Sequence, residues 1–134
     1  MAGGKREIRT DDAPAPVGPY SQAVVQDGIV YASGQIPLDP TTGKLVEGSI
    51  EAQAEQVFSN LRAVLAAANS SMDRVLRTSI YLTDLSLFSR VNGVYERQFG
   101  EGPKPARSTI GVASLPLGAE IEVDVIAAQD ETPV

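Results

Sequence analysis

Residues 119–128 constrain the fold more than any other segment, because they form a predicted strand with aliphatic side chains on both faces. Alternate side chains of a strand point to opposite sides, so Ile121, Val123 and Val125 share one face and Ile126 lies on the other. Proteins seldom expose large apolar sheet surfaces, so both faces of the sheet that contains this strand must be covered. Helices are expected to cover one face, and something further must cover the other.

A predicted hairpin opens the fold. Two β-prone runs, 20–25 and 29–35, flank Asp27 and Gly28, the residue pair that type I′ hairpin turns favour. Residues 36–44 are rich in proline and in turn-forming residues, so they predict a loop.

Two amphipathic segments predict helices. Ser49 is a suitable N-cap for the first helix and Asn69 a suitable stop. The apolar residues of this helix recur with the 3.6-residue period of one buried stripe, at Ala54, Val57, Phe58, Leu61, Val64, Leu65 and Ala68. Thr83 and Asp84 are suitable N-caps for the second helix, and Gly100 is predicted to end it. Its apolar residues are Leu87, Phe88, Val91, Val94, Tyr95 and Phe99.

Strands at 75–82 and 106–113 complete the order β-β-α-β-α-β-β. In the first of these, the alternation places Leu76, Thr78, Ile80 and Leu82 on one face and Val75, Arg77, Ser79 and Tyr81 on the other. The order predicts a single α+β domain over residues 1–134, with a mixed sheet and two helices on one face. Two helices cover only one face, so we expect self-association to bury the other.

The residue types that the chain lacks exclude most familiar catalytic sites. Its 134 residues include no cysteine and no histidine, which excludes thiolate nucleophiles, imidazole bases and His-ligated zinc. No loop brings several carboxylates together, so we expect no metal site. The formal charge of −6 repels phosphate backbones, and we expect no nucleic-acid partner. The first ten residues contain no apolar run typical of a leader peptide, and no stretch approaches the ~18 apolar residues that span a bilayer, so we expect a cytoplasmic protein.

Arg107 is the first candidate for a functional residue. Pro103 and Pro105 stiffen the chain just before it, at the start of a predicted strand. A guanidinium held there can bind a carboxylate through two parallel hydrogen bonds. The alternative is an ordinary solvated surface arginine.

Glu122 is the second candidate. Acidic and aliphatic residues alternate from 119 to 125, so Glu120, Glu122 and Asp124 are predicted to project from one strand face. A carboxylate within a subunit interface would be partly desolvated, which raises its pKa toward the range useful for proton transfer. The alternative is an edge strand that charged side chains keep soluble.

Further candidates lie beside the hairpin and in the second helix. Gly34 would let a ligand approach the backbone closely, while Ser33 and Tyr20 would donate hydrogen bonds, although similar residue pairs also occur in ordinary turns. Gly93 costs ~1 kcal/mol inside a helix. This glycine therefore indicates close packing or a functional role for its neighbour Asn92.

Five motifs occur in order along the chain. They are Gly18-Pro19-Tyr20-Ser21-Gln22-Ala23, Ser33-Gly34-Gln35-Ile36-Pro37, Arg90-Val91-Asn92, Pro105-Ala106-Arg107-Ser108 and Ile121-Glu122-Val123. Together they resemble the RidA family, also called YjgF/YER057c/UK114, over residues 10–129. The resemblance implies a chorismate mutase-like α+β fold that assembles as a homotrimer, with ligand sites between subunits and flexible chain ends outside the core.

The resemblance also implies an activity. RidA-type proteins hydrolyse the enamines 2-aminoacrylate and 2-aminocrotonate and their imine tautomers, 2-iminopropanoate and 2-iminobutanoate. Pyridoxal-phosphate dehydratases release these compounds, and the products are 2-oxo acids and ammonia. The reaction implied for this chain needs no cofactor and no metal.

Residue roles follow from the same resemblance. Arg107 would bind the substrate carboxylate and Glu122 would handle the attacking water. The positions that line or support the cleft are Tyr20, Ser33, Gly34, Asn92 and Thr109. Thr109 stands where many members have cysteine, so a thiol role is excluded while backbone contacts remain available.

Other functions are compatible with the same residues. A small-carboxylate-binding or regulatory module would share Arg107 and the cleft but would not turn its ligand over. Some relatives are described as ribonucleases that inhibit translation, or as chaperones, and the acidic charge argues against the first of these. An organellar location is compatible with a eukaryotic source.

Overall fold

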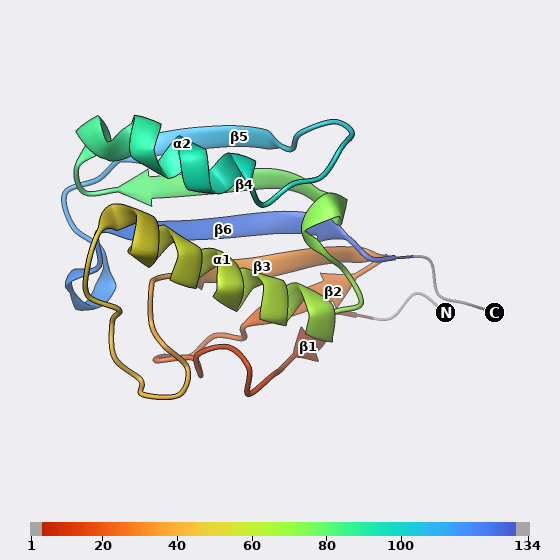
Figure 1. Cartoon of the computed structure of the whole chain (residues 1–134). Helices are drawn as coiled ribbons and strands as arrows, with labels where there is room; N and C mark the ends of the chain where they lie inside the picture. The colour runs from red at the N-terminus through yellow and green to blue at the C-terminus, as the bar shows by residue number, and fades with distance from the viewer. Residues whose placement is uncertain (1–3, 131–134) are drawn as a thin grey trace.

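One mixed six-stranded sheet carries two helices on one face (Figure 1). The structure is a computed structural model and describes residues 4–130. The sheet order is β1-β2-β3-β6-β4-β5; β4 and β5 are parallel and the other neighbouring pairs are antiparallel. The elements are β1 (Arg6–Ile8), β2 (Ala23–Gln26), β3 (Ile29–Gln35), α1 (Ile50–Ala67), β4 (Val75–Leu82), α2 (Phe88–Glu96), β5 (Ala106–Gly111) and β6 (Ile121–Ala128). The predicted α+β class and the single helical layer are confirmed.

β6 is a central strand of the sheet, which makes the alternative of a charged edge strand wrong. It pairs with β3 on one side and β4 on the other. Its inward side chains, including Ile121 and Val123, are fully buried beneath α1 with Phe58 and Leu61. The large apolar side chain of Ile126 is half-buried on the opposite face.

Local signals in the sequence fix the ends of several elements. Asp27 and Gly28 both have positive φ, 53° and 78°, which is the geometry of a type I′ turn. The Ser49 hydroxyl accepts a hydrogen bond from the Ala52 amide at 3.1 Å and caps α1. Asn69 has a φ of 57° just after this helix, where a left-handed residue ends the hydrogen-bond ladder.

The N-terminal strand β1 was not predicted. It has three residues, of which Arg6 and Glu7 are exposed, so its sequence carries no apolar alternation. It pairs with β2, which begins at Ala23 rather than at the predicted Tyr20. The six-stranded sheet therefore contains one short polar edge strand more than expected.

A β-bulge changes the predicted faces of β4. The register shifts between Val75 and Arg77, so that Leu76 is the additional residue. Val75 is buried in the core and Leu76 is 51% exposed, which makes the predicted assignment of these two residues wrong. Beyond the bulge, Thr78 and Ile80 face the core as predicted.

The second helix is shorter than predicted. A 3₁₀ turn at Leu85–Leu87 precedes α2, and Asp84 caps this turn by accepting a hydrogen bond from the Ser86 amide at 3.0 Å. α2 ends at Glu96, although Phe99 still packs its ring 4.8 Å from that of Tyr95. No helix within residues 4–130 is long and apolar enough to cross a membrane.

The sheet face away from the helices, called the open face below, carries exposed apolar side chains. Tyr31 in β3 and Ile110 in β5 are each 47% exposed there. Ile126 on β6 also belongs to this face. Self-association through the open face stays a prediction.

Candidate functional site

Glu122 lies on the open face of β6, directly against Gly34 in β3. A Cβ atom added to Gly34 would lie 2.0 Å from Glu122 Oε2 and 2.8 Å from its Cδ. The φ of Gly34 is not positive, so the position requires glycine for space rather than for backbone conformation. The glycine is what allows the carboxylate to lie against the strand.

A cavity of about 330 Å³, called the Glu122 cavity, opens beside this carboxylate. Four residues predicted from the sequence line it together: Tyr20, Ser33, Gly34 and Glu122. Apolar side chains from three separate segments, Val17, Ile36 and Pro116, complete much of its wall. The cavity therefore combines one carboxylate with hydroxyl groups and apolar surface.

The hydroxyl groups of this cavity are not equivalent. Ser33 Oγ donates to the Ser21 carbonyl at 2.6 Å, so toward a ligand it offers an acceptor rather than the predicted donor. The Tyr20 hydroxyl accepts from the Val17 amide at 3.2 Å and keeps its own hydrogen available to donate.

Gln22 holds the wall of the Glu122 cavity, a role that the sequence reasoning missed. It is 3% exposed, and its side chain accepts from the Thr10 amide at 2.8 Å and donates to the Pro14 carbonyl at 2.9 Å. These bonds fix the segment before β2. A polar glutamine within the predicted strand 20–25 is the signal that could have pointed to it.

Burial and a neighbouring acid act on the Glu122 carboxyl. Burial raises its pKa above the usual value, and the negative charge of Asp124 raises it further. Asp124 accepts a hydrogen bond of 3.1 Å from the Tyr81 hydroxyl, whose own pKa is raised by burial and by Asp124. Glu120 precedes β6 and is exposed, so the predicted row of three carboxylates is reduced to two.

Arg107 lies on the opposite side of the sheet, beneath α2. In the parallel pairing of β4 and β5 it is the partner of Thr78, which faces the core. Its guanidinium carbon lies 4.7 Å from the ring centroid of Tyr95 and 5.3 Å from that of Phe88. A 2.9 Å hydrogen bond between the Tyr95 and Thr78 hydroxyls fixes the first ring. Arg107 is thus half-buried and stacked on aromatic rings, unlike an ordinary solvated arginine.

Arg107 has no carboxylate partner in the part of the chain that the structure describes, residues 4–130. Its hydrogen-bond donors are available to a ligand there. It lines a shallow cavity of about 410 Å³, called the Arg107 cavity, with Asn92, Tyr95 and Lys104. Stacking on the ring faces leaves the edge of the guanidinium available to a carboxylate.

Two further predicted positions lie near this side of the sheet. Thr109 pairs with core-facing Ile80, and its hydroxyl oxygen is buried without a hydrogen-bond partner in the described chain. Gly93 follows Asn92 in α2, and a Cβ there would meet nothing within 4 Å. Close packing within the chain therefore does not explain Gly93, contrary to one of the two sequence interpretations.

The structure does not bring Arg107 and Glu122 together within one chain. Arg107 lies on the helix side of an edge strand, Glu122 lies on the open face of a central strand, and β4 runs between them. Each lines its own cavity. Of the predicted site residues, Tyr20, Ser33 and Gly34 thus accompany the carboxylate, and Asn92 accompanies the cation.

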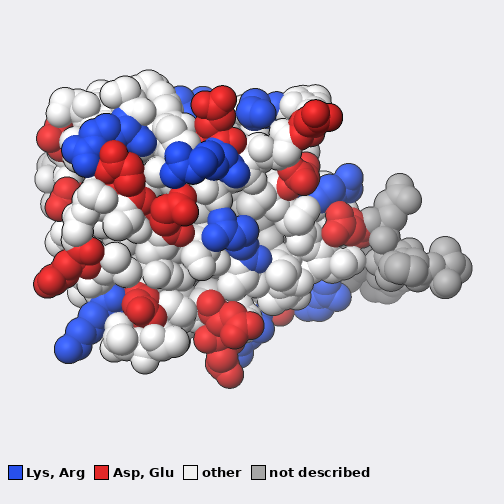
Figure 2. All heavy atoms as spheres, in the orientation of Figure 1, with Lys and Arg blue, Asp and Glu red and all other residues white. Residues whose placement is uncertain are grey.

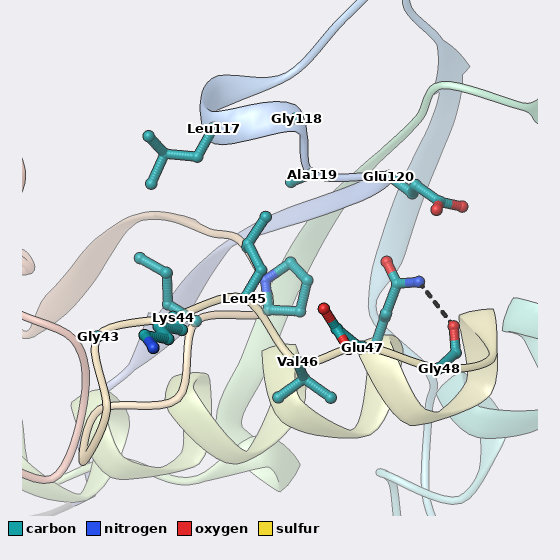
Figure 3. A pocket seen from close by; sticks show the side chains of 13 residues that line it. Gly43, Lys44, Leu45, Val46, Glu47, Gly48, Leu117, Gly118, Ala119 and Glu120 are labelled. Atoms are coloured by element: carbon teal, nitrogen blue, oxygen red, sulfur yellow. Dashed lines mark hydrogen bonds between the residues drawn. The ribbon is translucent and has the colours of Figure 1, made fainter.

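A larger groove of about 920 Å³ lies elsewhere, between the loop before α1 and the turn before β6 (Figure 3). Lys44, Glu47 and Leu117 line it, and Gln53 closes one end by donating to the Gly48 carbonyl at 3.2 Å. None of the predicted site residues lines this groove. In the part of the chain that the structure describes, no group of three or more acidic residues could hold a metal ion.

Comparisons with known proteins identify the family. The family model described as Endoribonuclease L-PSP matches residues 10–129. The chain is 48% identical to the putative regulator AldR of Lactococcus lactis, covering 90% of this chain and 94% of the relative. It is 42% identical to the mouse 2-iminobutanoate/2-iminopropanoate deaminase, covering 93% and 92%. The crystal structure of RidA from an Antarctic Psychrobacter superposes with a TM-score of 0.88 at 46% identity, covering 92% of this chain and 98% of that one. The chain belongs to the RidA family.

Proposed function

We propose that this protein is an imine deaminase that hydrolyses 2-iminopropanoate and 2-iminobutanoate to 2-oxo acids and ammonia, at sites formed between the subunits of a homotrimer. One observation carries the proposal: an aromatic-stacked arginine that has no ion pair within residues 4–130 and a half-buried carboxylate lie on opposite faces of one sheet, each lining its own cavity. The name of the mouse relative supports the choice of reaction.

A cyclic trimer is the assembly that suits this arrangement. In a heterologous interface, one surface of a subunit meets a different surface of its neighbour, and a closed ring repeats that contact. The Arg107 side of one subunit would then face the Glu122 side of the next. Exposed Tyr31 and Ile110 on the open face support such an association, because monomers seldom expose apolar sheet surface.

The proposed reaction uses the chain's own groups. Arg107 holds the substrate carboxylate through two parallel hydrogen bonds. Glu122 orients a water and takes a proton from it as the water oxygen attacks the carbon of the protonated imine, which forms a neutral tetrahedral carbinolamine. The same carboxyl returns that proton to the nitrogen. As the C–N bond breaks, Glu122 takes the hydroxyl proton and passes it to the departing ammonia, so the 2-oxo acid and ammonium leave. Tyr20 and Ser33 shape the cavity and supply one donor and one acceptor.

The test couples the purified protein to a threonine dehydratase and follows the appearance of 2-oxobutyrate and ammonia. The wild type should accelerate this step, and Arg107→Ala should lose at least about 100-fold in kcat/KM, because two charge-assisted hydrogen bonds to the substrate are removed. Lack of acceleration by folded wild-type protein would refute the proposal. Such a result would also break the proposed functional link to pyridoxal-phosphate dehydratases.

A second candidate function is a regulatory module that binds small carboxylates without turnover, and the name of the Lactococcus relative favours it. It would use the same arginine but would not need Glu122 as a base. A ribonuclease fits less well, since the chain carries a formal charge of −6. Figure 2 shows acidic and basic side chains interspersed over the helical face, without a broad basic surface for RNA.

A further inference from the structure

A second carboxylate is held beside Glu122. Asp124 lies two residues further along β6, so both side chains project from the open face. Tyr81 in β4 is directly opposite Glu122 in the antiparallel pairing, yet its hydroxyl donates to Asp124 Oδ2 at 3.1 Å. The tyrosine therefore reaches diagonally across the strand pair and fixes Asp124 next to Glu122.

We propose that Asp124, anchored by Tyr81, is a positioning residue that sets how readily Glu122 takes up a proton. An ionised Asp124 opposes the appearance of a second negative charge nearby. The hydrogen bond from Tyr81 stabilises the ionised form of Asp124 and prevents its carboxylate from turning away into solvent. The catalytic consequence rests on the proposed function, whereas the effect on proton uptake by Glu122 does not.

Other titratable groups face Glu122 from the neighbouring strands and from its cavity. Besides Asp124 they are Tyr81 in β4, Tyr31 in β3 and Tyr20 in the cavity wall. Arg77 lies further along β4 and donates to the Ser108 hydroxyl at 2.7 Å. In the proposed trimer, Arg107 of a second copy would also face Glu122 and would favour its ionised form. Asp124 opposes that cation, so Glu122 stays basic enough to take a proton from water.

The pKa direction agrees with this role. Burial is the larger cause of the raised pKa of Glu122, and the charge of Asp124 is the second. Replacing Asp124 by asparagine removes the second cause while keeping nearly the same volume. The pKa of Glu122 should then fall.

The experiment is a titration of the Glu122 side-chain carboxyl by ¹³C NMR in the intact protein, with the signal assigned from Glu122→Gln. In Asp124→Asn the midpoint should fall by more than the uncertainty of the fit, and in Asp124→Glu, which keeps the charge, it should stay close to that of the wild type. Asp27→Asn is the matched control, because it removes one exposed carboxylate at the β2–β3 turn, away from Glu122. An unchanged midpoint in Asp124→Asn, or an equal fall in Asp27→Asn, would overturn the inference.

Tyr81→Phe tests the anchor without changing any charge. It should shift the Glu122 midpoint in the same direction as Asp124→Asn but by less. An unchanged midpoint in Tyr81→Phe would show that Tyr81 does not anchor Asp124. In the coupled assay, the acidic limb of the kcat/KM profile should move to lower pH in Asp124→Asn by the same amount as the midpoint. A titration shift without a move of this limb would overturn the catalytic role. Absence of turnover in the wild type would instead refute the proposed function, while the titration would still decide the inference.

Discussion

Glu122 and Arg107 occupy opposite faces of one sheet, and their surroundings favour opposite states of charge. Around Glu122, burial and the acid at Asp124 raise the pKa, which favours the protonated, neutral form. Around Arg107, the electron-rich faces of Tyr95 and Phe88 stabilise the cation and leave its donors free. One region is prepared to accept a proton and the other to hold an anion. The proposed hydrolysis of an amino-acid-derived imine would need both, so in this proposal each chain supplies two different half-sites.

The largest expected effect separates chemistry from binding. Glu122→Gln should reduce kcat for imine hydrolysis by about 10²–10⁴-fold, because it removes the proton acceptor, while the affinity for a small 2-oxo acid stays nearly unchanged. Arg107→Lys should instead weaken that affinity, since lysine keeps the charge but loses the two parallel donors. Steady-state kinetics and calorimetric binding of 2-oxobutyrate measure the two effects. Normal turnover in Glu122→Gln would eliminate the assigned role of the carboxylate.

Gly34→Ala should have the next largest effect, because its Cβ would occupy the place of the Glu122 carboxyl. Oε2 is the far end of a flexible side chain, so the protein should fold with Glu122 displaced by an ångström or more. Activity should fall by about 100-fold, as expected for a misplaced catalytic group. The coupled assay and thermal unfolding together check this. Near-normal activity would show that Glu122 need not lie against β3.

Gly93→Ala is the matched control on the other half-site. Its Cβ would meet nothing within 4 Å, and alanine is the better helix former in α2. The free energy of unfolding should rise by about 0.5–1 kcal/mol, as measured by urea denaturation. A loss of stability would instead mean that a second copy packs against this glycine, which would place Gly93 in the subunit interface.

The smallest expected effect concerns an acid–arginine pair that is already complete. Arg90 in α2 donates to Glu51 in α1 at 2.9 and 2.6 Å, and these hydrogen bonds lower the pKa of Glu51 from 4.5 to about 2. Because the folded-state pKa is lowered, the stabilisation is present above pH 4.5 and is lost as the pH falls toward 2. The stability difference between wild type and Glu51→Gln should therefore shrink over that range in urea denaturation. A difference that stays constant with pH would contradict the ionic origin, and Arg90→Ala should reproduce the effect from the other partner.

The sequence predicted the elements whose signals are local. The 3.6-residue apolar period, the Ser49 cap and the Asp27-Gly28 turn all lie within short windows, and all were confirmed. The β4 bulge and the strand β1 could not be predicted in this way, because both depend on pairing with distant residues. One additional residue at Leu76 moves neighbouring side chains to opposite faces without leaving a mark in the local pattern.

The candidate site was predictable as a set of residues but not as an arrangement. Motifs identified Arg107 and Glu122, yet only the register of β5 on β4 shows that Arg107 lies beneath α2. Tyr95 was predicted as part of an apolar helix stripe, and its second role as a platform for the guanidinium depends on how α2 docks on the sheet. The contact between Tyr81 and Asp124 likewise joins two strands that are distant in sequence.

The central claim is that each site takes Arg107 from one chain and Glu122 from another, and subunit mixing tests it most directly. Arg107→Ala and Glu122→Gln proteins, each inactive alone, are unfolded together and refolded as a 1:1 mixture, and imine hydrolysis is measured in the coupled assay. Random assembly pairs an intact Arg107 with an intact Glu122 at one interface in four, so the mixture should recover about a quarter of wild-type activity. A mixture that stays as inactive as its components would contradict the account.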